Sequence, residues 1–175
     1  MKNILYLHGF ASSSDSTKAK LFKEFVNSHK NLNVLTPDLP NNLIGWSKLI
    51  EELCEKHNPV AFIGSSMGGF YSTFYARKLG AMDVLLNPAV LPAEGMKSYL
   101  GKNSNYATGE EFIMKNDEIE HLKLMEKKLK KNNYINDRTM VLLESGDEVL
   151  NYKEAVSFYS GCLLYTSPSP RDRYG

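Results

Sequence analysis

The sequence predicts an α/β fold in which a mostly parallel sheet carries helices on both faces. Short apolar runs alternate with stretches whose apolar residues recur at helical spacing, as in residues 60–63 and then 70–79. These runs are continuously apolar, which is typical of strands buried on both sides. The length of 175 residues and the 42% hydrophobic content fit one domain with a core of ordinary size.

Each element follows from a local pattern. Residues 3–7 form an apolar run that ends at His8-Gly9, and a serine-rich loop behind it supplies N-caps for a helix around residues 21–26. Pro37 ends the next run, and Asn87-Pro88 ends a later one. The expected strands are residues 3–7, 33–36, 60–63, 84–86 and 140–143, with helices around 21–26, 46–54 and 70–79.

Residues 89–138 interrupt this alternation. They contain no convincing core strand, and their middle is a charged helix at residues 119–131. Its lysines are expected to form a solvated face. We expect this segment to be a helical lid above the strand ends, inserted into a domain that spans residues 1–161.

Composition excludes several classes of protein. Lys+Arg number 21 against Asp+Glu 20, a net charge of +1 that gives no case for a nucleic-acid or membrane partner. Two cysteines cannot form a disulfide framework. The apolar run at residues 4–7 is too short for a signal peptide, and no stretch is long enough for a membrane span, so a cytoplasmic location is expected.

The chemistry is expected at Gly64-Ser65-Ser66-Met67-Gly68, a G-x-S-x-G pattern between a strand and a helix. A serine nucleophile on such a tight turn needs small neighbours because the backbone is strained and other chain segments lie close. The register selects Ser66 as the catalytic nucleophile. A glycine-rich turn that binds phosphate, or that only packs, is the alternative interpretation.

Oxyanion donors are expected from two backbone amides. Met67 follows the nucleophile directly, and Phe10 follows a glycine in the loop after the first strand. His8 in the same loop is expected to shape that loop rather than to act as a base.

Asp147 is the candidate triad acid. It follows the strand at residues 140–143 and comes after Ser66 in the chain, as the order Ser…Asp…His requires. Glu148 is the runner-up, and an aspartate that only forms a turn is the structural alternative.

Four motifs together resemble the YqiA-like esterases, which are small α/β-hydrolases that cleave short-chain acyl esters. The motifs are Leu5-Tyr6-Leu7-His8-Gly9-Phe10, the Ser66 pentapeptide with Gly69, Leu86-Asn87-Pro88-Ala89-Val90 and Gly146-Asp147-Glu148-Val149-Leu150. The resemblance covers about residues 1–161. It implies an α/β-hydrolase fold, Ser66 as nucleophile, Asp147 as triad acid, and a mechanism without metal or cofactor.

The triad base is missing from the sequence. The histidine of such a triad follows the acid, whereas no histidine occurs here after His121. Residues 162–175 contain Pro168 and Pro170 and resemble translated adapter sequence, so we expect a truncated chain with a foreign or disordered tail and without its last strand and helix. Activity of the chain as written is therefore doubtful.

Two function classes follow. The first is a serine esterase acting on a small acyl ester, with thioesterase and amidase as close variants. The second is a non-catalytic α/β-hydrolase-fold protein that binds a small molecule. The sequence assigns no oligomeric state.

Overall fold

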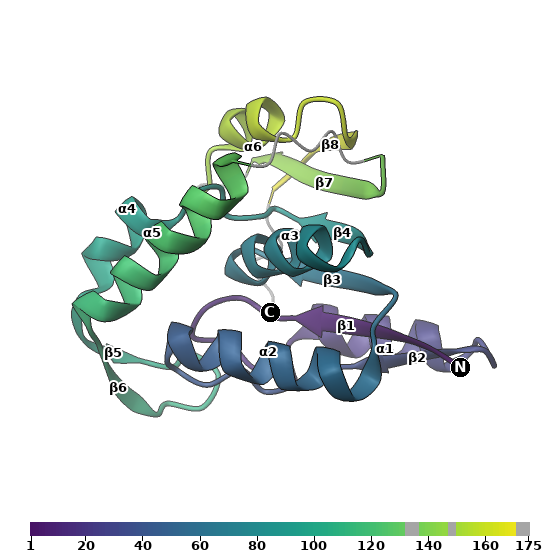
Figure 1. Ribbon diagram of the computed structural model, residues 1–175, viewed down its shortest axis with the longest axis horizontal. Helices are drawn as coiled ribbons and strands as arrows, with labels where there is room; N and C mark the ends of the chain where they lie inside the picture. Colours follow the sequence, from purple (N-terminus) through teal and green to yellow (C-terminus); the bar gives the residue numbers. More distant parts are fainter. Residues whose placement is uncertain (132–136, 147–149, 171–175) are drawn as a thin grey trace.

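The computed structural model describes residues 1–131, 137–146 and 150–170, with only the backbone of residues 169 and 170. A six-stranded sheet runs through the molecule in the order β2-β1-β3-β4-β7-β8, and each adjacent pair is parallel (Figure 1). The strands are β1 (Lys2–Leu7), β2 (Leu32–Leu35), β3 (Ala61–Ser65), β4 (Met82–Leu86), β7 (Thr139–Gly146) and β8 (Leu163–Pro170).

The predicted parallel α/β fold is confirmed. Each of the five expected strands is present, with ends that differ by a few residues from the predicted ones. Successive side chains of β1 point to opposite faces, so Leu5 and Leu7 enter one core cluster and Tyr6 enters another. Burial on both sides explains why these strands are continuously apolar.

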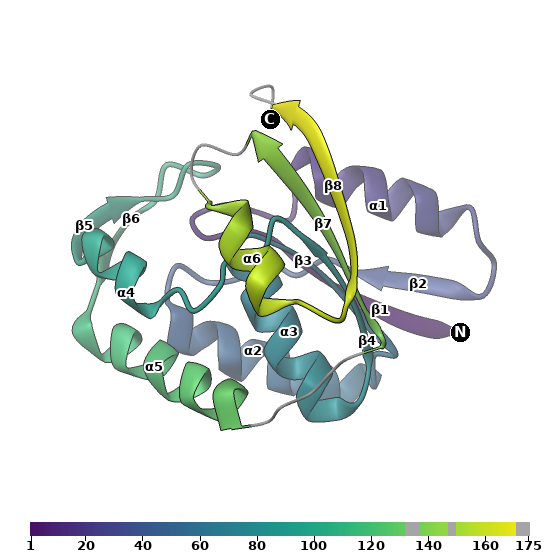
Figure 2. The same ribbon diagram turned by 90° about the horizontal axis from the view of Figure 1, so that it is seen from above.

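Helices cover both faces of the sheet (Figure 2). Leu5 and Leu7 pack with α2 and α3, and Leu85 of the same face packs with α6. Tyr6 packs with α1 on the opposite face. The bounds are α1 (Thr17–Asn27), α2 (Leu43–His57), α3 (Met67–Leu79) and α6 (Tyr152–Phe158).

The segment between β4 and β7 leaves the sheet, as expected for residues 89–138. It contains α4 (Ala93–Met96), the 3-10 turn η1 (Lys97–Tyr99), the antiparallel hairpin of β5 (Gly101–Ser104) and β6 (Glu111–Met114), and α5 (Asn116–Lys131). We call this segment the insertion. The hairpin was not expected, because its two strands are short and β5 is polar.

A buried carboxylate connects the insertion to the main domain. Glu118 of α5 is 1% exposed, and its Oε1 accepts a hydrogen bond from the Leu43 N–H at 2.8 Å. Its Oε2 accepts one from the Lys115 N–H at 2.9 Å. One side chain thereby satisfies free amides at the starts of both α2 and α5.

The expectation that the fold ends near residue 161 is wrong for residues 163–170. They form β8, which pairs in parallel with β7 from Met140↔Leu163 onward. Pro168 and Pro170 are tolerated because β8 is an edge strand with a single neighbour. In the part of the chain that the structure describes, no helix follows β8. The foreign origin of residues 162–175 stays a prediction.

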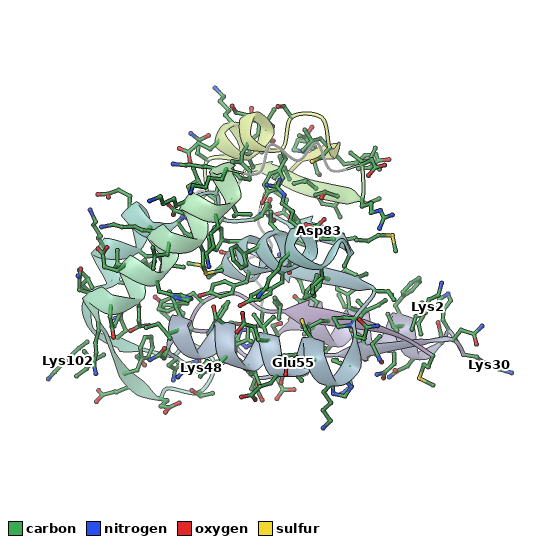
Figure 3. The ribbon with its side chains drawn as sticks, in the orientation of Figure 1. Lys2, Lys30, Lys48, Glu55, Asp83 and Lys102 are labelled. Atoms are coloured by element: carbon green, nitrogen blue, oxygen red, sulfur yellow. The ribbon has the colours of Figure 1, made fainter. Side chains whose placement is uncertain are left out.

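Asp83, near the start of β4, is a buried acid on the α3 face of the sheet (Figure 3). It is 1% exposed, and its Oδ1 accepts a hydrogen bond from the Thr139 hydroxyl at 2.5 Å. Its Oδ2 has no hydrogen-bond partner among the described residues. Burial raises the pKa of Asp83 to about 6, although the Thr139 hydroxyl and the Arg77 charge favour the carboxylate.

This raised pKa predicts that Asp83 makes the fold less stable as the pH rises. The folded state holds a proton on Asp83 that the unfolded state loses near pH 4, so the stabilisation declines as the pH rises through about 6. Urea unfolding checks this through the free energies of unfolding of Asp83→Asn and of the unchanged protein. Relative to the unchanged protein, the variant should gain about 1 kcal/mol of stability between pH 5 and pH 8. A stability difference that is equal at both pH values would contradict the assignment.

Candidate active site

Ser66 lies on the turn between β3 and α3. Its backbone has φ 53° and ψ −119°, a left-handed conformation that a residue with a side chain rarely adopts. Its N–H donates to the Leu86 carbonyl at 3.1 Å, and its carbonyl accepts from the amides of Gly69 and Ala89, each at 2.9 Å. These bonds hold the strained turn. The side chain is half-buried and makes no capping bond to α3.

The glycines around Ser66 are required by close packing. A Cβ at Gly68 would overlap the carbonyl of Leu7 and lie 2.5 Å from the carbonyl oxygen of His8. A Cβ at Gly64 would overlap Gly68, and one at Gly69 would lie 2.7 Å from the Cβ of Pro88. The predicted reason for the G-x-S-x-G spacing is therefore visible in the packing.

The two expected oxyanion donors lie in the segments next to Ser66. Met67 is the first residue of α3, and a Cβ at Gly9 would lie 3.7 Å from the Cβ of Ser66. Gly9 therefore brings the loop after β1, with Phe10, alongside Ser66. Among the described residues, neither the Phe10 amide nor the Met67 amide donates to any other group.

His8 uses both ring nitrogens to hold the loop. Its Nε2 accepts from the Leu39 N–H at 3.0 Å, so the proton is on Nδ1, which donates to the Gly9 carbonyl at 2.8 Å. The ring is 2% exposed and meets Trp46 edge-on at 5.8 Å. Burial is the main reason why the pKa of His8 is lowered, although the Gly9 carbonyl and the Asp38 charge oppose this effect. These bonds fit the expected loop-shaping role.

The other histidines lie in helices or just beyond a helix end, and they make other contacts. His121 of α5 shares a hydrogen bond of 2.8 Å with the Ser47 hydroxyl of α2, and burial lowers its pKa. His29 contacts the end of α1, and His57 ends α2. Within the described residues, no hydrogen bond joins any of the four histidines to Ser66.

Asp147 and Glu148 lie outside the described residues. The strand that leads to them is nevertheless held in place by Asn87, the residue after β4, whose backbone is left-handed with φ 43°. The Asn87 Oδ1 accepts from the Glu144 N–H at 2.7 Å, and its own N–H donates to the Leu142 carbonyl at 2.9 Å. The sequence places Asn87 just beyond a strand end but predicts no role for it.

A cleft of about 300 Å³ lies where β4 ends, beside the middle of β7 and β8. Lys18 and Glu144 supply opposite charges to its wall. The Glu144 Oε2 is buried there and has no hydrogen-bond partner among the described residues. The remaining lining residues are Leu86, Asn87, Leu142, Leu143, Tyr165, Thr166 and Ser167.

Neither a metal centre nor a membrane span emerges from the described ranges. In those ranges no group of three or more His, Cys, Asp or Glu side chains is placed to hold a metal ion. None of the helices there is long and apolar enough to cross a membrane.

Comparison with known proteins gives a family and a fold. Residues 3–167 match the family described as Uncharacterised protein family (UPF0227). Est1E from Butyrivibrio proteoclasticus, solved with ferulic acid, superposes with a TM-score of 0.69 at 15% identity, over 95% of this chain and 79% of that one.

Two further solved structures share the architecture. The esterase domain of a Rhodothermus marinus protein has a TM-score of 0.68 at 15% identity, over 94% of this chain and 75% of that one. FphF, a fluorophosphonate-binding serine hydrolase of Staphylococcus aureus, has a TM-score of 0.63 at 20% identity, over 98% and 77%. The fold is therefore that of the α/β-hydrolases.

The packing around Ser66 predicts a large cost for one added methyl group. Gly68→Ala should lower the free energy of unfolding by about 3 kcal/mol or more, because backbone carbonyls of β1 cannot move aside as a flexible side chain can. Gly95→Ala in α4 is the matched control, since its Cβ would meet no atom within 4 Å. Chemical unfolding of both variants checks this, and equal stabilities would refute the packing argument.

Proposed function

This chain belongs to the Uncharacterised protein family (UPF0227), and we propose that its site serves a serine esterase reaction on short-chain acyl esters. The observation that carries the proposal is the strained turn at Ser66, which faces a loop with a free backbone amide. Such a turn costs folding energy, and its recurrent use in α/β-hydrolases is to hold a nucleophile above the sheet.

In the proposed reaction, the Ser66 Oγ attacks the ester carbonyl carbon and transfers its proton to a base. The carbonyl oxygen becomes an oxyanion, which the amides of Phe10 and Met67 stabilise. The alcohol leaves with a proton and an acyl-enzyme remains, which water then hydrolyses. Asp147 is proposed to orient the base.

The base is the deficient component. No histidine follows Asp147 in the sequence, and no described hydrogen bond joins a histidine to Ser66. In a related catalytic unit, losing one essential member lowers turnover by about 10⁶-fold. We therefore propose that the chain as written retains a nucleophile site and oxyanion donors but turns over slowly.

The descriptions of the structural neighbours support a hydrolase reaction of this type. One is described as an esterase domain, and another as a fluorophosphonate-binding serine hydrolase with substrate bound. Thioesters and amides react through the same steps, so they are variants of the proposal. Among the described residues no histidine bonds to the Ser66 side chain, which favours one other class, a non-catalytic binder of small molecules.

Fluorophosphonate labelling followed by intact-mass measurement tests the nucleophile. The reagent should add to Ser66 slowly, and imidazole in solution should accelerate the addition at least about tenfold because it replaces the missing base. Ser66→Ala should remain unlabelled under both conditions, after circular dichroism has shown that it is folded. Labelling that persists in Ser66→Ala would refute the assignment, and fast labelling without imidazole would refute the missing base.

The same assay tests Asp147 against its neighbour. A triad acid acts through the base, so Asp147→Asn should leave the slow reaction unchanged and reduce the imidazole-dependent acceleration by about tenfold. Glu148→Gln is the matched control and should keep the full acceleration. The reverse pattern would transfer the role to Glu148.

A further inference from the structure

The turn of the β5–β6 hairpin touches the loop that carries Phe10. The Tyr106 N–H donates to the carbonyl of Ala11 at 2.9 Å. The side-chain amide of Asn105 donates to the carbonyl of Ser12 at 3.3 Å. Two consecutive carbonyls of the loop, directly after Phe10, are therefore held by the insertion and not by the main domain.

Asn105 is the residue that organises this turn. It is 6% exposed, and its backbone N–H donates to the Glu110 carbonyl at 2.8 Å. Its Oδ1 accepts from the amides of Ala107 at 2.9 Å and Thr108 at 3.1 Å. The turn is thus built around one side chain, as is typical of asparagine.

The two N–H groups of the Asn105 side chain point out of the turn. One donates to Ser12, and the other donates to the Oδ1 of Asn41 at 2.8 Å. Asn41 in turn donates to the Glu110 carboxylate at 2.8 Å. The backbone carbonyl of Asn105 accepts from the Gly109 N–H at 2.8 Å, so every polar group of Asn105 is hydrogen-bonded.

The loop needs such external bonds because its conformation is strained. Ala11 has φ 53° and is 5% exposed, and alanine in the left-handed region is disfavoured by about 1–2 kcal/mol. A strained residue persists only where the surroundings determine its conformation. His8 holds the loop from the side of the main domain, and the hairpin holds it from the other side.

The Phe10 side chain adds a third contact with the insertion. Its ring meets Tyr99 of η1 edge-on at 5.5 Å and Phe112 of β6 edge-on at 5.7 Å. Edge-to-face pairs of this kind are worth about 0.5–1.5 kcal/mol beyond the area they bury. Phe10, Ala11 and Ser12 are therefore each held by a different group of the insertion.

We propose that Asn105 is a positioning residue for the oxyanion hole. It acts directly on the carbonyl of Ser12, and indirectly on that of Ala11 through the turn that places the Tyr106 amide. These two carbonyls set the direction of the loop that presents the Phe10 amide to Ser66. The insertion then supports the site through its contacts with Phe10, Ala11 and Ser12. This inference rests on the proposed function, since the Phe10 amide is a donor only if Ser66 attacks a carbonyl.

Three variants test the inference. Asn105→Ala removes every side-chain bond, whereas Asn105→Asp keeps the acceptor that builds the turn and loses both outward donors. Lys102→Ala is the matched control, because Lys102 is exposed at the outer end of the same hairpin (Figure 3). Circular dichroism and thermal unfolding establish that each variant folds.

The first measurement is the NMR order parameter of the backbone amides of Phe10, Ala11 and Ser12. In both Asn105 variants these values should fall from about 0.85 to below about 0.6, while Lys102→Ala stays unchanged. The second is imidazole-accelerated labelling of Ser66. Its rate should fall about tenfold in both Asn105 variants, because an oxyanion donor acts only when it is correctly placed.

The outcomes separate the two proposals. Unchanged order parameters in the Asn105 variants overturn the positioning role, whatever the chemistry of Ser66. If the order parameters fall but the labelling rate is unchanged, Asn105 holds the loop without positioning an oxyanion donor, and the proposal is overturned. Labelling of the unchanged protein that does not depend on Ser66 refutes the proposed function, and the order parameters then still decide whether Asn105 holds the loop.

Discussion

The close approach of the start of α3 to the end of β1 is the constraint on which the site depends. Gly68 lies directly against the carbonyls of Leu7 and His8, where no side chain fits. That contact brings the loop after β1 beside Ser66, and Gly69 brings Pro88 and the end of β4 to the other side of the turn. Three strand ends thereby converge on one residue, which is the general place for ligands in parallel α/β sheets. The geometry of Ser66 is a consequence of backbone packing and not of a capping bond made by its side chain.

The loop after β1 is held by hydrogen bonds from both the main domain and the insertion. His8 provides the contact of the main domain, with both ring nitrogens bonded to backbone groups. The hairpin supplies the other contacts through the Asn105 side chain and the Tyr106 amide. Ala11 keeps its left-handed conformation between these two sets of contacts. The segment that we expected to be a lid is therefore bonded directly to the loop that lies beside Ser66.

Sequence reasoning predicted the parts of the molecule that depend on local patterns. The central strands are short, continuous apolar runs, and the turn at Ser66 carries its requirement for small residues in the sequence itself. The β5–β6 hairpin was missed because polar β5 has no hydrophobic alternation and is stabilised by distant contacts such as Tyr106 with Ala11. β8 was missed because residues 162–175 were set aside as a foreign or disordered tail, whereas an edge strand tolerates Pro168 and Pro170. Asn105 carries no signal at all, since its role exists only after folding brings Ser12 and Asn41 to it.

The bonding of His8 implies that acid acts on this molecule in two opposite senses. Protonation of Asp83, near the amino end of β4, favours the folded domain as a whole. Protonation of His8 would place a second donor against the Leu39 N–H and remove the acceptor that holds the loop. Acid would therefore favour the folded state through Asp83 and disfavour it through His8, whose bonds hold the loop after β1. Because burial lowers the pKa of His8, the bond between His8 and the Leu39 amide persists in mildly acidic solution and is lost only at a lower pH.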